Sequence, residues 1–322
     1  MSVANAVAAV RSLREHPLLL RLLQILLLAI TVGFCVWGVR HDWAKAGDRL
    51  EHARFGYLAV AFAVIAAYYL VFICGWIRML AAWRIRVGYG EALEAEMISM
   101  LAKYVPGGVW TPAARTVALR RSAGVTETTT VLASILLEAA LSAISGVIVF
   151  VIGLAWVRNA HAPLPLLIAF ALLCAVLIHP RVFEPLANRL LRPFGSTITP
   201  LPFGIMLALL AFYCVTWLIG GLGLYFLLLS VDAHPALSTI AFLGGTSAIG
   251  AIVAVLAVFA PSGLGVREAA MYELLKAVTS NGPALDATLM NRLAITLVEV
   301  ALFVVGLVGW RFRRQTADSP QT

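Results

Sequence analysis

Charged side chains within or beside long apolar runs are the residues of this sequence whose chemistry most needs an explanation. A charge at bilayer depth is costly unless it is paired or hydrated, so such residues often mark a pathway through a membrane protein. Arginines in this setting can bind a lipid phosphate, with glutamates as counter-ions or proton carriers. The alternative is that the same residues form fixed salt bridges between helices. The residues are Arg115, Glu138, Arg267, Glu268, Arg292 and Glu299.

Two short segments rich in proline and glycine interrupt the sequence close to these charges. They are Tyr104-Val-Pro-Gly-Gly-Val-Trp110 and Phe259-Ala-Pro-Ser-Gly-Leu-Gly265. Each predicts a re-entrant turn from which a new helix starts, and a helix N-terminus beside an arginine favours an anion. An ordinary cytoplasmic turn is the alternative for the first segment. The predicted turn residues are Pro106, Gly107, Gly108, Pro261, Ser262, Gly263 and Gly265.

The two segments belong to a weak internal repeat. In each copy a Pro-x-Gly break precedes an arginine, and a glutamate follows in an LxExAL frame, at Glu138 and at Glu299. The helices that carry these glutamates are expected to run in opposite directions, which is typical of inverted repeats in transporters. The sequence therefore predicts one repeat over 91–157 and another over 237–310. Chance similarity in a sequence rich in leucine and alanine is the alternative.

Composition identifies the class of protein that must position these residues. The chain has 322 residues, of which 61% are hydrophobic and 12% charged. A soluble domain has about 25% charged residues, so a soluble enzyme, a nucleic-acid-binding domain and a disordered chain are excluded. The net charge of +8 is assigned to cytoplasmic loops and does not indicate nucleic acid.

The apolar runs predict an all-α polytopic membrane protein with about 7–8 transmembrane helices, since about 20 apolar residues cross a bilayer. Two of its segments are expected to be re-entrant or broken helices within a single integral membrane domain over 1–322. The runs are 22–39, 57–77, 139–157, 162–178, 203–229, 235–266 and 293–310.

The distribution of Lys and Arg predicts the orientation. Most of them fall on the cytoplasmic side if both termini are cytoplasmic. In that arrangement the segment from Pro235 to Asp286 must leave the outer side and return to it. A full helical hairpin and a pair of re-entrant half-helices both satisfy this requirement.

Motifs for energy use and catalysis are not found in the sequence. It has no GxxxxGK[ST] motif for ATP and no HExxH or other metal-ligand cluster. We therefore predict no metal site, no cofactor, no intrinsic ATPase and no enzymatic activity.

The motifs around the two turns carry a family resemblance. With Lys103-Tyr-Val-Pro-Gly-Gly-Val-Trp110, Arg115, Leu136-Leu-Glu138 and Pro261-Ser-Gly-Leu-Gly-Val-Arg-Glu268, the chain resembles the transmembrane region of lysylphosphatidylglycerol synthases, a flippase-like family. The resemblance implies re-entrant segments, a lipid-sized cavity and a bacterial cytoplasmic (inner) membrane location. The chain looks like a stand-alone member, because no soluble aminoacyl transferase follows the membrane region. Ser262 stands where many relatives have glycine.

The resemblance also implies a function, which is translocation of a lipid or lipid-linked headgroup across the membrane. The substrates it suggests are phospholipids, polyprenyl-phosphate-linked sugars and hopanoid-type lipids. Two alternatives stay open, an intramembrane enzyme acting on a lipid headgroup and a membrane scaffold for a lipid or glycan synthase. A second copy of the chain and a lipid-modifying enzyme are the candidate protein partners, and no nucleic-acid partner is expected.

Overall fold

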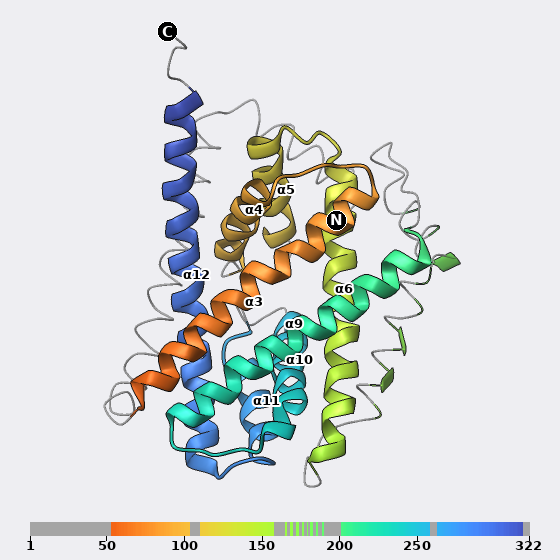
Figure 1. The fold of residues 1–322 in the computed structure, drawn as a ribbon. Helices are drawn as coiled ribbons and strands as arrows, with labels where there is room; N and C mark the ends of the chain where they lie inside the picture. The colour runs from red at the N-terminus through yellow and green to blue at the C-terminus, as the bar shows by residue number, and fades with distance from the viewer. Residues whose placement is uncertain are drawn as a thin grey trace.

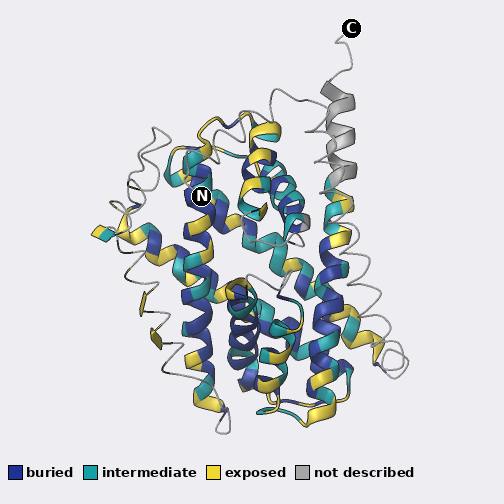
Figure 2. Ribbon diagram, turned by 180° about the vertical axis from the view of Figure 1, so that it is seen from behind, coloured by how far each residue is buried: buried dark blue, intermediate teal, exposed yellow. Residues whose placement is uncertain are grey.

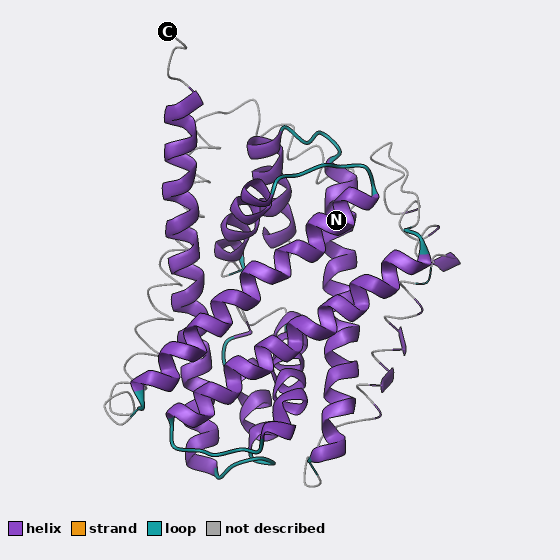
Figure 3. Cartoon of the chain, in the orientation of Figure 1, coloured by secondary structure: helices purple, strands orange, loops and turns teal. Residues whose placement is uncertain are grey.

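The computed structural model describes residues 53–103, 110–157, 201–257 and 263–317, with isolated positions between 165 and 189. Within these residues every regular element is a helix (Figure 3). The α-helices are α3 (Phe55–Ala82), α4 (Tyr89–Ala102), α5 (Trp110–Ala123), α6 (Thr128–Gly153), α9 (Phe203–Ser230), α10 (Ile240–Leu256), α11 (Val266–Leu275) and α12 (Asn281–Ala317). Short 3-10 turns at Leu154–Trp156 and Leu237–Thr239 follow α6 and precede α10.

Five of the described helical segments are long and apolar enough to cross a membrane: Phe55–Ala82, Thr128–Trp156, Phe203–Ser230, Leu237–Leu256 and Asn281–Gly306. They confirm the all-α membrane class and correspond to five of the predicted apolar runs. The predicted run 22–39 lies outside the described residues, as does most of 162–178. Among the predicted turn residues, Pro106, Gly107, Gly108, Pro261 and Ser262 also lie outside them.

Local hydrogen bonds fix where several helices begin and end. At the end of α3, the N–H of Trp83 donates to the carbonyl of Leu80, and Arg84 turns the chain with a φ of 62°. Before α4, the N–H of Gly88 donates to the Glu91 carboxylate at 2.9 Å. This contact satisfies a backbone donor that has no partner within the first turn of the helix.

Helices α3 and α9 pack against each other in antiparallel directions (Figure 1). The start of α3 is tied to the end of α9, because the N–H of Arg54 donates to the carbonyl of Ser230 at 2.9 Å. An ion pair of 2.7 Å between Arg54 and Asp232 lies at the same end. The two helices are less buried than α6 and α10, which leaves apolar surface facing outward (Figure 2).

Two helical hairpins occupy opposite ends of the bundle (Figure 1). The first hairpin is α4–α5, and the second hairpin is α10–α11. In both hairpins the two helices pack against each other. In chain order, α3, the first hairpin and α6 are followed by α9, the second hairpin and α12, so a helix–hairpin–helix arrangement occurs twice.

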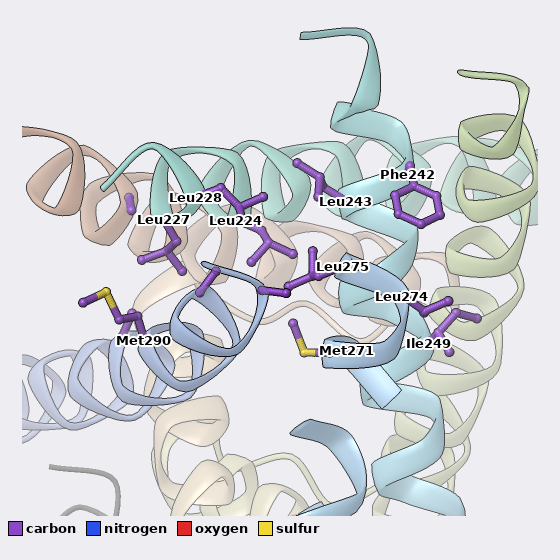
Figure 4. Packing of buried hydrophobic residues seen from close by; sticks show 14 of the residues in the cluster. Leu224, Leu227, Leu228, Phe242, Leu243, Ile249, Met271, Leu274, Leu275 and Met290 are labelled. Carbon is purple, nitrogen blue, oxygen red and sulfur yellow. The ribbon is translucent and has the colours of Figure 1, made fainter. Parts of the chain in front are cut away.

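The largest apolar cluster holds the second hairpin against α9 and α12 (Figure 4). Where these side chains would otherwise contact water, the hydrophobic effect drives their packing. Where they would otherwise contact lipid, close van der Waals contact stabilises the packing instead. The residues labelled there are Leu224, Leu227, Leu228, Phe242, Leu243, Ile249, Met271, Leu274, Leu275 and Met290.

Candidate functional site

A buried arginine with two carboxylates forms the first charged site, which we call the Arg115 cluster: Trp76, Glu96, Arg115, Glu138 and Tyr213. The Nη1 of Arg115 lies 2.5 Å from Oε2 of Glu138, and its Nε lies 2.7 Å from Oε2 of Glu96. The Tyr213 hydroxyl donates to Oε1 of Glu138 at 3.0 Å. The guanidinium also lies over the Trp76 ring, 3.7 Å from its centroid, a cation–π contact.

Five helices contribute one side chain each to the Arg115 cluster. Trp76 comes from α3, Glu96 from α4, Arg115 from α5, Glu138 from α6 and Tyr213 from α9. The indole N–H of Trp76 donates to the Ser134 hydroxyl at 2.8 Å, which fixes the ring beneath the guanidinium. The cluster therefore joins both helices of the first hairpin to three of the long helices.

Burial makes the charge balance of this cluster important. Arg115 is 4% exposed and Glu138 is 3% exposed, and the Glu96 side chain is 13% exposed. One cation faces two carboxylates, so one negative charge is not balanced by an ion pair within the cluster. An unbalanced charge away from water is costly.

A second charged site, which we call the tip cluster, lies where the two hairpins approach each other. It consists of Tyr69, Lys103, Arg267, Glu268, Arg292 and Glu299. Lys103, just after α4, forms an ion pair with Glu299 of α12, and the Tyr69 hydroxyl donates to the same carboxylate at 2.6 Å. Lys103 is within electrostatic range of both Arg267 and Arg292.

Arg267 differs from the other cations of the tip cluster. It is half-buried near the start of α11, and its side chain lies against α10 at Gly250. In the described parts of the chain, no carboxylate lies within ion-pair distance of its guanidinium. Arg292, by contrast, is 4% exposed and lies 3.6 Å from Oε1 of Glu268. The cluster thus contains three cations and two carboxylates.

Glu268 also shapes the backbone at the start of α11. Its Oε2 accepts a hydrogen bond of 2.7 Å from the N–H of Gly265. Gly263 has a φ of +68°, which favours glycine, and a Cβ on it would lie 2.6 Å from the Cα of Ala254. The predicted helix that carries Arg267 near its start is present. A residue larger than glycine at position 263 would strain the backbone and clash with Ala254.

The six predicted charged residues separate into the two clusters. Arg115 and Glu138 pair with each other, as the salt-bridge alternative requires, so the guanidinium expected to hold a phosphate already contacts two carboxylates. The other four, Arg267, Glu268, Arg292 and Glu299, belong to the tip cluster. Arg292 and Glu299 both belong to helix α12, but they pair with different residues.

Five residues of the clusters were missed as site residues by sequence reasoning: Tyr69, Trp76, Glu96, Lys103 and Tyr213. In the sequence, Glu91, Glu94 and Glu96 lie close together before Met97, a pattern typical of the polar part of an interfacial helix. Lys103 appears in the family motif, and its position beside the Pro-Gly turn was the available signal. The two tyrosines lie in apolar runs and give no signal in a single sequence.

The ion pairs Arg54–Asp232 and Lys276–Glu273 lie outside these clusters, on more exposed side chains. Glu273 and Lys276 form an i,i+3 pair at 2.5 Å, and this hydrogen bond raises the pKa of the Lys276 ammonium. Among the described residues, no group of three or more His, Cys, Asp or Glu side chains could hold a metal ion.

The family comparison covers most of the chain. Residues 22–302 match the family model described as the lysylphosphatidylglycerol synthase TM region. No curated protein sequence matches the chain. The matched range contains all eight described α-helices in whole or in part and both charged clusters. The chain therefore belongs to the lysylphosphatidylglycerol synthase transmembrane-region family, as a membrane protein related to lipid modification or translocation.

Proposed function

We propose that this protein moves a lipid or lipid-linked headgroup across the membrane, without an ATPase of its own. The observation that carries the proposal is the meeting of two opposed hairpins at a cluster in which cations outnumber carboxylates. We further propose that the two helix–hairpin–helix units are inverted repeats, each somewhat longer than the predicted 91–157 and 237–310 because each begins with a long helix. Sites between such repeats can open alternately to the two sides.

The headgroup is proposed to bind at the tip cluster. A phosphate is a strong acceptor for arginine, which offers several N–H donors in a fixed geometry. Arg267 has no carboxylate partner among the described residues and lies in the first turn of α11, where backbone N–H groups and the helix dipole also favour an anion. Lys103 and Arg292 would add positive charge near the same phosphate.

Arg115 is proposed to hold the first hairpin to the long helices and not to bind the headgroup. Two carboxylates and an aromatic ring surround its guanidinium. A phosphate would have to displace these partners and leave a buried carboxylate without a cation, which is strongly unfavourable. This assignment narrows the predicted headgroup site to Arg267, Glu268, Arg292 and Glu299, with Lys103 added.

Lipid movement in proteoliposomes tests the proposal. Labelled phospholipids and polyprenyl-phosphate lipids are offered to wild type, Arg267→Ala, Arg267→Lys and the control Lys276→Ala, which removes an exposed cation from the same hairpin. Loss of movement with Arg267→Ala, partial retention with Arg267→Lys and full retention with Lys276→Ala are expected. Equal movement in wild type and Arg267→Ala would contradict the headgroup site.

Mass spectrometry of the same lipids separates the other functions. A change of lipid mass would transfer the proposal to an intramembrane enzyme acting on the headgroup. If the lipid masses are unchanged and folded wild type moves none of the lipids, the result would favour a scaffold that recruits a lipid or glycan synthase. We also propose that the protein is located in the bacterial inner membrane. Its candidate partners are a second copy of the chain and a lipid-modifying enzyme.

A further inference from the structure

We propose that the Arg115 cluster is a proton-binding site in which Glu96 and Glu138 share one exchangeable proton. The site is separate from the tip cluster, to which the headgroup is assigned. It would make the attachment of the first hairpin depend on protonation. The proton-binding step stands without the proposed lipid transport, whereas its coupling to transport rests on that function.

The first argument is charge. Both carboxylates contact the same guanidinium, at 2.5 Å for Glu138 and 2.7 Å for Glu96. Arg115 is the one cation that forms an ion pair with either of them in the described parts of the chain. One guanidinium neutralises one carboxylate, and the second would remain an anion in a poorly hydrated interior. Binding a proton removes this charge, and the proton belongs to the pair rather than to either residue alone.

The second argument is that, among the described residues, no neighbouring group supplies the missing positive charge. The groups that face the pair are the Trp76 ring from α3 and the Tyr213 hydroxyl from α9, together with Arg115 from α5. The Tyr68 hydroxyl of α3 is within electrostatic range of both carboxylates and of Arg267. The other basic residues of α5, Arg120 and Arg121, are exposed in its last turn.

The third argument concerns hydrogen bonds. Glu138 accepts from Arg115 and from Tyr213, one on each carboxylate oxygen. Oε2 of Glu96 has no hydrogen-bond partner in the described structure, although it contacts the guanidinium, and the Nη2 of Arg115 likewise has none there. A proton gained by the pair can therefore be accommodated without displacing the donors to Glu138.

The position of the pair links protonation to movement. Glu96 and Arg115 belong to the two helices of the first hairpin, and Glu138 belongs to α6. With the pair fully ionised, the two carboxylates compete for one guanidinium and repel each other. With one proton bound, the charges balance and the hairpin is held against α6. A ligand can shift such an equilibrium only through different affinities for the two states, and here the ligand is the proton.

The proton itself can be detected by infrared difference spectroscopy of the full chain in lipid nanodiscs during a pH titration. The carbonyl stretch of one protonated carboxylic acid per chain is expected, with a shift in heavy water. Either Glu96→Gln or Glu138→Gln should abolish it, because Arg115 then balances the remaining carboxylate. The control Glu273→Gln changes an exposed glutamate and should retain the band.

Persistence of the band in both Glu96→Gln and Glu138→Gln would overturn the proposal, as would its absence at every pH at which wild type is folded. Glu96→Gln alters the more exposed carboxylate, so it keeps the test decisive if Glu138→Gln does not fold. A band that both variants remove identifies the pair as the site of the proton, whereas a band that only one folded variant removes would overturn the shared proton.

Coupling is tested separately in proteoliposomes with a pH difference across the membrane. Wild type should move lipid several-fold faster in one direction of the gradient than in the other, and Glu96→Gln should lose this dependence while still moving lipid. Equal rates in both directions for wild type would overturn the coupling. A carboxylic-acid band without any lipid movement would leave the proton site standing and remove the transport function, so the two failures are distinguishable.

Discussion

Arg115 shows how strongly one side chain can depend on its partners. Removing the guanidinium with Arg115→Met would leave two carboxylates without an ion-pair partner, which we expect to cost about 3–5 kcal/mol of stability. Glu138→Gln keeps the shape and the contact to Tyr213, so a loss of about 1 kcal/mol is expected. Apparent melting temperatures in detergent measure both, with the exposed Arg120→Met as the control. A smaller loss for Arg115→Met than for Glu138→Gln would contradict this account.

Tyr69 allows the hydrogen bond to Glu299 to be tested alone. Tyr69→Phe removes the donor but keeps the ring, and a hydrogen bond to a charged group is worth about 1.5–3 kcal/mol. Tyr57→Phe on the same helix is the control, because the Tyr57 ring stacks on Phe226 and is partly exposed. We expect a clear fall in melting temperature for Tyr69→Phe only. Equal melting temperatures for the two variants would mean that the hydroxyl does not stabilise the bundle.

Sequence alone identifies the embedded charges but not their partners. The residues are recognisable because a glutamate or arginine within an apolar run needs compensation. Their partners come from distant positions, since Lys103 and Glu299 are 196 residues apart and Tyr213 and Glu138 are 75 apart. Trp217 illustrates the same limit. Its indole lies in an apolar run and gives no signal in the sequence, yet it is 7% exposed and donates to the carbonyl of Ser142 at 2.7 Å.

At the scale of elements, α10 is held by close backbone contacts with its neighbours. A Cβ on Gly221 of α9 would lie 2.5 Å from the backbone nitrogen of Gly244, whereas a Cβ on the adjacent Gly220 would meet nothing nearer than 3.8 Å. Small residues allow helices to approach closely, which favours van der Waals packing in membranes. This pair of glycines on one helix provides a matched test of the contact.

We expect opposite effects from alanine at these two positions. Gly221→Ala should overpack the contact between α9 and α10 and cost about 1–3 kcal/mol. Gly220→Ala should gain about 0.5–1 kcal/mol, because alanine favours a helix over glycine. Thermal unfolding in detergent measures the difference. If Gly221→Ala proves as stable as Gly220→Ala, the close approach of α9 and α10 is wrong.

Helix positions are predicted well where an apolar run contains no charge. The run 203–229 corresponds closely to α9 at Phe203–Ser230, and 57–77 lies within α3 at Phe55–Ala82. The run 293–310 locates α12, but the helix begins at Asn281. A hydropathy criterion stops at Arg292, whereas the structure buries this arginine inside the helix bundle beside Glu268.

At the scale of the whole molecule, the described helices are consistent with the predicted parity. The end of α3 and the starts of α6 and α9 lie at the same end of the bundle as the C-terminal end of α12 (Figure 1). The second hairpin leaves the opposite end and returns to it, as the sequence requires of 235–286. The number of membrane crossings depends also on the segments 22–39 and 162–178, which lie mainly outside the described residues.

Reporter fusions test the orientation. The excess of Lys and Arg predicts a cytoplasmic C-terminus. A C-terminal green fluorescent protein should therefore fluoresce and a C-terminal alkaline phosphatase should be inactive. A phosphatase fused after Ala236, in the exposed loop between α9 and α10, should be active. The reverse pattern would contradict the predicted orientation and place the C-terminus on the outer side of the membrane.

The pairing of α3 with α9 also has a consequence for how the chain is made. Arg54 is synthesised long before its partner Ser230, and Tyr69 precedes its partner Glu299 by 230 residues. During translation, α3 and Lys103 are therefore made before α9 and α12, which carry their hydrogen-bond and ion-pair partners. A polar group that waits in lipid is a signal for chaperones and proteases. We therefore expect the first half of the protein to be fully stabilised only when α12 has been synthesised and packed against it.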